Sequence, residues 1–183
     1  MTTPTIADRV EWLVLAYQLP PKRSSVRAAV RRKLSAAGVV FVSPACAVAP
    51  LSGPGERAMR RARATITSAG GFAILLAGRA LEGESDLIAV FNAIRDGEYE
   101  AIIAGCRDAV TRIEESTAVC EFRYQGLWEK DIELRRLSAR YKDVRGQDAY
   151  GARQGQAAAA ALAAYRSALD EYASRVYAAD RSS

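Results

Sequence analysis

The fold is decided at residues 11–42, which read EWLVLAYQLPPKRSSVRAAVRRKLSAAGVVFV. The apolar run Glu11–Leu19 ends at a Pro-Pro pair and predicts a buried strand. A helix is expected next, capped by Ser24 or Ser25 and stopped by the glycine of SAAGVV. Val39–Val42 predicts a second strand, so the chain opens as β-α-β.

The same kind of pattern continues along the chain. Cys46–Leu51 predicts a third strand that pairs back as a hairpin, and Ser52–Gly55 is expected to be a loop. Glu56–Ala69 has the spacing of a helix, and Phe72–Ala77 predicts a last strand. The order β-α-β-β-α-β is the ferredoxin-like pattern, with both helices on one face of an antiparallel sheet. The other face is also apolar, so we expect a partner subunit or the rest of the chain to cover it.

The hydrophobic period changes after Gly83. Glu84–Ile94 predicts a short helix, and Glu98–Thr117 carries apolar residues at alternating spacings of four and three. Similar seams occur within 128–145 and 154–178. Three such seams in one chain predict an antiparallel helical bundle that packs on itself.

The sequence therefore predicts an α+β protein with a ferredoxin-like βαββαβ domain at residues 1–81 and an antiparallel helical bundle at 82–183. The two parts differ in charge. The first has twelve basic and three acidic residues, a net charge of +9, whereas the second has fourteen and eighteen, a net charge of −4. A concentrated positive field attracts polyanions or oxyanions.

Composition argues against catalysis. The chain has no histidine, which excludes His-dependent triads and His-ligated metal sites. Its three cysteines, Cys46, Cys106 and Cys120, are spaced too irregularly for a metal motif or a disulfide framework. No phosphate-binding glycine loop occurs. We therefore expect no enzyme activity, no cofactor and no metal.

The sequence also predicts a cytoplasmic protein that has no contact with membranes. Met1–Ala7 lacks the charged and apolar regions of a signal peptide. The longest apolar runs, Val39–Val42 and Phe72–Ala77, are far shorter than the ~20 residues that a membrane helix needs.

The basic helices are the candidate site. Arg27 and Arg31 are spaced i, i+4, as are Arg57 and Arg61, so each pair projects from one helix face. Guanidinium groups suit phosphate and other tetrahedral oxyanions. Two such helices on one sheet face predict a continuous patch for the DNA backbone, with another anion or a merely solvated surface as the alternatives. The predicted DNA- or anion-binding set is Lys22, Arg23, Arg27, Arg31, Arg32, Arg57, Arg60 and Arg61.

Four stretches together resemble the amino-terminal domain family of the chromate resistance protein ChrB. They are residues 11–42, AVAPLSGPGERAMRRARATITSAGGFAILLAGRAL, IAVFNAIRDGEYEAIIAGCRDAVTRIEE and ALDEYASRVYAAD. The third contains the family's D-x-E-Y-x-x-x-x-x-x-C pattern as Asp96, Glu98, Tyr99 and Cys106. The chain departs from the family at Arg31, where a tryptophan is expected, and in the weaker hairpin at 43–47.

The resemblance implies a chromate-responsive transcriptional regulator of a chromate-efflux operon, whose longer members carry an additional carboxy-terminal domain. The fold is also similar to that of small CRISPR adaptation nucleases and of the ferredoxin-like module of PaaX-type repressors. The nucleases need an aspartate at the end of the first strand to hold a metal, but Ala16–Leu19 contains no carboxylate. Nuclease activity is therefore not expected.

The sequence thus predicts a ChrB-like transcriptional regulator or DNA-associated regulatory protein that acts as a homodimer. Its expected partners are DNA or an oxyanion such as chromate. The competing hypothesis is a non-enzymatic interaction or structural module, in which the bundle binds a protein and the basic helices only keep the surface solvated.

Overall fold

The computed structural model describes residues 11–181 and consists of two compact units, Met1–Leu87 and Ile88–Ser183. The division falls within helix α3 (Glu84–Ala118), and the boundary expected after residue 81 stays a prediction. The expectation for residues 1–7 lies outside the described part. Among the described residues, none of the helices combines the length and the apolar character that crossing a membrane requires.

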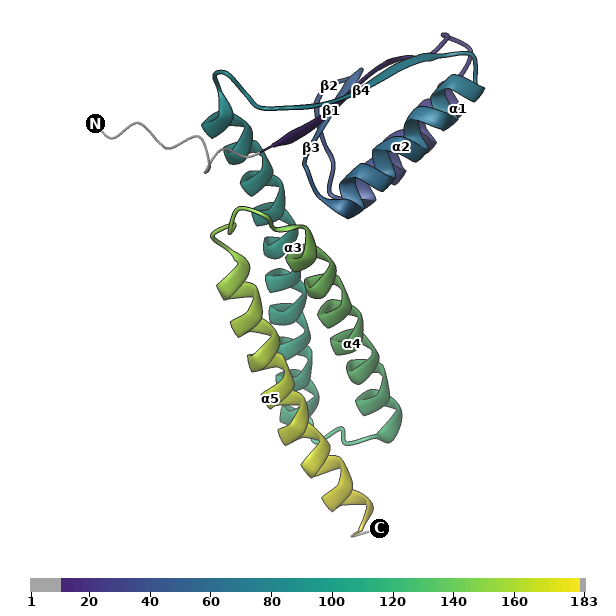
Figure 1. Cartoon of the computed structure of the whole chain (residues 1–183). Coiled ribbons are helices and arrows are strands. Elements are labelled where there is room, and N and C mark those ends of the chain that lie inside the picture. Colours follow the sequence, from purple (N-terminus) through teal and green to yellow (C-terminus); the bar gives the residue numbers. More distant parts are fainter. Residues whose placement is uncertain (1–10, 182–183) are drawn as a thin grey trace, which may run out of the picture. The chain divides into compact units, whose positions relative to one another are not determined.

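The first unit contains β1 (Trp12–Gln18), α1 (Ser24–Ala36), β2 (Val40–Ser43), β3 (Cys46–Pro50), α2 (Gly53–Ser68) and β4 (Phe72–Gly78). Its four strands form an antiparallel sheet in the order β2-β3-β1-β4. Both α1 and α2 cover the same face of this sheet (Figure 1). The predicted ferredoxin-like βαββαβ fold is confirmed.

The core of this unit lies between the sheet and its two helices. Strand alternation points Leu13, Leu15 and Tyr17 of β1 toward the helices, where they pack with Leu34 of α1 and Met59 of α2. Burial of apolar surface contributes roughly 25 cal/mol per Å². The burial of these side chains therefore holds α1 and α2 against one face of the sheet, and the opposite side of each helix faces solvent.

The expected starts of the two helices are wrong in detail. Arg23 occupies the N-cap position of α1 without a side-chain hydrogen bond, and Ser24 already lies inside the helix. The segment predicted as a loop forms the first turn of α2, which begins at Gly53 after an extended Ser52. Pro54 is well placed there, because its fixed φ is helical and its missing N–H is not needed in the first turn.

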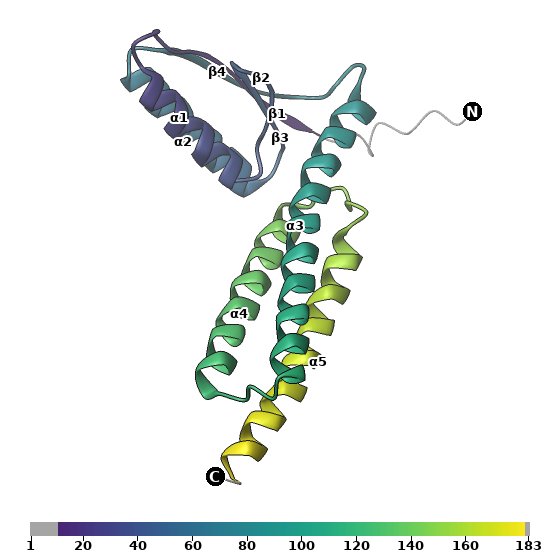
Figure 2. The same ribbon diagram turned by 180° about the vertical axis from the view of Figure 1, so that it is seen from behind.

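The second unit is an antiparallel bundle of α3, α4 (Tyr124–Gln147) and α5 (Gly155–Asp180), which lie side by side in Figures 1 and 2. The expected bundle is confirmed, but the break expected between residues 94 and 98 is wrong. The helix α3 is continuous over 35 residues. Arg95 and Tyr99, on either side of Gly97, are both buried, and Tyr99 donates a hydrogen bond to Asp148 in the loop between α4 and α5.

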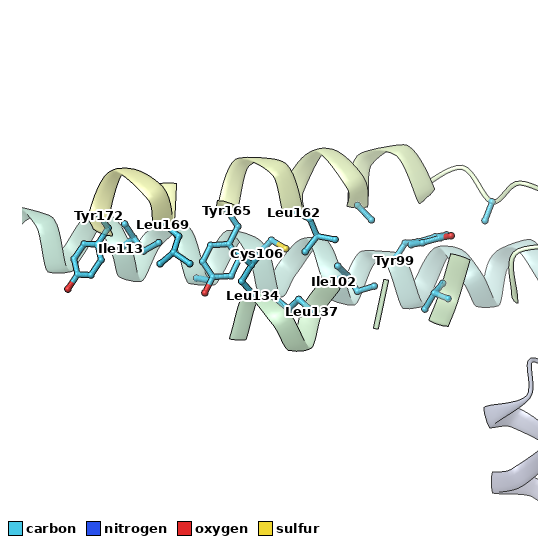
Figure 3. Close-up of a cluster of buried hydrophobic side chains, with 14 of the residues drawn as sticks. Tyr99, Ile102, Cys106, Ile113, Leu134, Leu137, Leu162, Tyr165, Leu169 and Tyr172 are labelled. Atoms are coloured by element: carbon cyan, nitrogen blue, oxygen red, sulfur yellow. The ribbon is translucent and has the colours of Figure 1, made fainter. Parts of the chain in front are cut away.

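The heptad positions of the three helices meet in a single core, shown in Figure 3. The core contains the tyrosines Tyr99, Tyr165 and Tyr172, and the hydroxyls of the last two donate to backbone carbonyl oxygens of the bundle. Tyr165 donates to the carbonyl oxygen of Lys130 at 2.7 Å, and Tyr172 donates to that of Glu121 at 2.7 Å. Burial raises the pKa of Tyr165 to about 12. The core thus takes up large aromatic rings without leaving these two hydroxyls unpaired.

Candidate functional site

A solvent-facing groove runs between α1 and α2. Its volume is about 550 Å³, and small apolar side chains such as Ala29 and Ala58 form part of its lining. Three exposed cations also line it: Lys33 from the last turn of α1, and Arg57 and Arg61 from successive turns of α2. The two helices therefore bring together basic residues that are far apart in the sequence.

These three cations are available to an external anion. Within the part of the chain that the structure describes, Lys33, Arg57 and Arg61 form no ion pair with a carboxylate. Their positive charge is therefore not neutralised locally. Of the residues that the structure describes, no acidic one lines the groove, so no carboxylate there repels a phosphate or another oxyanion.

Two arginines of the predicted set are engaged elsewhere. Arg27 is half-buried and donates a hydrogen bond to the carbonyl oxygen of Leu19 at 3.3 Å. The guanidinium of Arg31 lies 4.6 Å from the ring centroid of Phe41 on β2, a cation–π contact. Burial raises the pKa of Tyr17, and the positive charges of Arg31 and Arg27 oppose this shift. Arg27 and Arg31 are therefore engaged with the carbonyl oxygen of Leu19 and the ring of Phe41, and neither belongs to the groove lining.

A third member of the set has an internal partner. Arg60 forms an ion pair with Glu56 one turn earlier, at 2.7 Å. Lys22, Arg23 and Arg32 are exposed but do not line the groove. Of the predicted residues, the structure thus brings only Arg57 and Arg61 together in one groove.

Lys33 belongs to the groove but was absent from the predicted set. It is spaced i, i+4 from Ala29, and Ala58 and Ala62 are spaced in the same way on α2. Facing rows of alanine indicate where two helices approach closely, because small side chains permit short separations. This alanine spacing is visible in the sequence, whereas the i, i+4 pair Arg27 and Arg31 lies on another face of α1.

The residues of the D-x-E-Y pattern make contacts within the helical bundle. Asp96 accepts the backbone N–H of Gln154 at 2.8 Å, just before α5. Glu98 forms an ion pair with the buried Arg95 at 3.0 Å. Cys106 lies in the core, and burial raises the pKa of its thiol, which disfavours the reactive thiolate. These residues act on the structure of the bundle.

Fold and groove together define the class: a ferredoxin-like domain with a cationic groove between its helices, followed by a helical bundle. The chain belongs to the family described as "Protein ChrB, N-terminal", whose family model matches residues 27–183. This membership associates it with chromate resistance. Residues 11–26 lie outside the matched range. No curated protein and no solved structure matches the chain.

Proposed function

We propose that the chain is a regulatory protein of a chromate-resistance system that binds DNA, with backbone phosphates held in the groove between α1 and α2. The observation that carries this proposal is the presence in one groove of Lys33, Arg57 and Arg61, none of which pairs with a carboxylate among residues 11–181. The family supports the link to chromate resistance. The charge of the first 81 residues, +9, supports a polyanionic partner.

Phosphate contacts explain why such a groove suits DNA. Lysine and arginine bind backbone phosphates of any sequence, and these contacts supply affinity and position on the duplex. The small side chains in the lining, such as Ala58, allow a sugar-phosphate backbone to approach the two helices. Lys22, Arg23 and Arg32 are exposed outside the groove and add to the surrounding field.

The experiment measures binding to two labelled duplexes, one from upstream of the gene and one of random sequence, by fluorescence anisotropy at low salt. A triple variant, Lys33→Gln with Arg57→Gln and Arg61→Gln, is expected to lose affinity for both duplexes. The matched control replaces three exposed arginines of the bundle, Arg140, Arg166 and Arg175, by glutamine. Equal weakening by both triple variants, or no binding by the parent, contradicts the proposal.

A small oxyanion such as chromate is a second candidate for the same groove. A tetrahedral dianion matches a cluster of guanidinium and ammonium donors. Among the described residues, the lining contains neither a carboxylate nor a cysteine, and we assign it the binding of the oxyanion. Calorimetric titration with chromate in the absence of DNA tests this candidate, and heat that persists unchanged in the triple variant contradicts it.

An exposed apolar face of the sheet supports two further hypotheses, the interaction module and the homodimer. Phe72, Ile74 and Leu76 alternate along the edge strand β4 on the face away from the helices, and all three are exposed. Exposed apolar patches of this kind indicate protein contacts. A homodimer through this face predicts that Phe72→Ser with Leu76→Ser yields a monomer in sedimentation equilibrium. A parent that is itself monomeric contradicts the homodimer.

A further inference from the structure

A second cleft lies on the bundle, between α4 and α5, and has a volume of about 470 Å³. Three aromatic side chains line it: Tyr124 and Trp128 from α4 and Tyr177 from α5. Two carboxylates, Asp131 and Asp170, share the lining. This composition differs from that of the groove between α1 and α2, where the charges are positive.

The three aromatic rings of this cleft are exposed to solvent and do not belong to the buried core of the bundle. Trp128 is 64% exposed, and Tyr124 and Tyr177 are about half exposed. Tyr124 and Tyr177 contact each other with ring centroids 5.7 Å apart, and the hydroxyl of Tyr124 donates to Asp180 Oδ2 at 3.1 Å. Trp128 follows Tyr124 by one helical turn, so it lies on the same face of α4. The rings are thus arranged around the cleft before any partner arrives.

The charges at this cleft select the partner. Among the described residues, no lysine or arginine lines it. Asp131 is already paired with Arg135 at 2.7 Å, whereas Asp170 forms no ion pair in the described part of the chain. Aromatic faces next to a carboxylate attract a guanidinium or ammonium group. The cation–π attraction is strongest where water is displaced from the contact.

We propose that this cleft is a docking site for a segment of another protein that presents an arginine or lysine side chain. The cation stacks on Trp128 and the two tyrosine rings, and Asp170 neutralises its charge. Tryptophan and tyrosine dominate binding energy at protein interfaces, which supports a peptide as the occupant. The carboxylates disfavour a nucleic acid at this surface. The proposal does not depend on DNA binding, because it uses none of the groove residues.

The test uses the full chain and a helical peptide of alanine and leucine that carries two arginines one turn apart. Binding is followed by NMR, through the shift of the Trp128 indole N–H. The arginine peptide is expected to shift this signal, and the same peptide with glutamate in place of arginine is expected not to. Trp128→Ala should weaken binding at least about tenfold, as for a central interface aromatic. Asp170→Asn should weaken it by a smaller factor and reduce its dependence on salt.

The matched control is Leu81→Ala, which removes a large apolar side chain that is 92% exposed and lies outside the cleft. It should leave peptide binding unchanged. Trp128 is largely exposed, so its replacement is not expected to unfold the bundle, and circular dichroism checks this. Equal binding of the arginine and glutamate peptides overturns the proposal. So does a result in which Trp128→Ala abolishes self-association of the chain while the arginine peptide does not bind.

Discussion

The hydroxyl of Tyr99, on α3, donates a hydrogen bond to Asp148 Oδ2, in the loop between α4 and α5, across 3.2 Å. The other oxygen of the same carboxylate accepts the backbone N–H groups of Gly151 and Ala152, each at 2.9 Å. The carboxylate of Asp148 therefore stabilises the turn of the loop through its backbone hydrogen bonds and also connects the loop to α3 through Tyr99. The family motif residue Tyr99 is accordingly a part of the bundle's structure.

This relationship gives the first prediction. Tyr99→Phe removes one hydrogen bond and should lower the free energy of unfolding by about 1 kcal/mol. Asp148→Ala should cost more, about 3 kcal/mol, because it leaves two backbone N–H groups and the Tyr99 hydroxyl without their acceptor. Urea unfolding measures both. Tyr177→Phe, at a half-exposed ring, is the control and should change stability by less than about 0.5 kcal/mol.

A second prediction concerns alkaline pH. Burial, followed by the charge of Asp148, raises the pKa of Tyr99 from 10.0 to about 12, and burial raises that of Tyr165 to about 12. The folded state therefore holds these protons more tightly than the unfolded state. Their stabilising contribution is fully present below pH 10 and is lost as the pH rises from 10 toward 12.

Urea unfolding at a series of pH values checks this, with phenolate absorbance as a direct record of ionisation. The Tyr165→Phe variant should show a shallower loss of stability across the same window. Stability that declines equally steeply in the variant would count against this assignment.

The contact of Arg31 with Phe41 gives a third prediction. Arg31→Ala should lower the free energy of unfolding by about 0.5–1 kcal/mol, because it removes a cation–π contact at 4.6 Å. Arg32→Ala is the neighbouring control, since Arg32 is exposed, and should leave stability nearly unchanged. Thermal unfolding distinguishes the two, and equal effects would show that the cation–π contact contributes nothing.

A fourth prediction separates two arginines of α2 by their role in DNA binding. Arg57 lines the groove, whereas Arg60 is paired with Glu56 at 2.7 Å. Arg57→Gln should reduce the slope of log K against log salt by about 0.9, the value for one phosphate contact to B-form DNA. Arg60→Gln should reduce it by less than half as much, because its charge is already balanced. Anisotropy titrations at several salt concentrations measure both slopes, and equal slopes for the two variants would remove the groove from the DNA interface.

The sequence was sufficient for the fold of the first unit because its signals are local. The apolar run Glu11–Leu19 and the Pro-Pro pair after it mark the first strand, and the glycine of SAAGVV marks the end of the following helix, before any contact is known. The continuity of α3 was missed for the opposite reason. A glycine at position 97 weakens a helix locally, but the buried side chains of Arg95 and Tyr99 belong to contacts with distant residues.

The site was less accessible to sequence reasoning. An i, i+4 pair of arginines shows that two side chains share a helix face, and does not show what that face meets. Arg27 donates a hydrogen bond to the carbonyl oxygen of Leu19, and Arg31 makes a cation–π contact with Phe41 of β2. The engagement of Arg60 could have been predicted, since Glu56 lies one turn before it.

Gly97 leads to the last prediction, which concerns stability. A Cβ atom built on Gly97 has no atom of the described residues within 4 Å outside its own helix, and Gly97 lies well inside α3. Gly97→Ala should therefore raise the free energy of unfolding by about 1 kcal/mol, the difference in helix propensity. Gly71→Ala is the matched control, because its Cβ would lie 2.6 Å from the carbonyl oxygen of Gln18 and should destabilise the protein. Urea unfolding compares the two. A destabilising Gly97→Ala would mean that the helix is not continuous at this position, and that the two shorter helices predicted from the sequence describe α3 better.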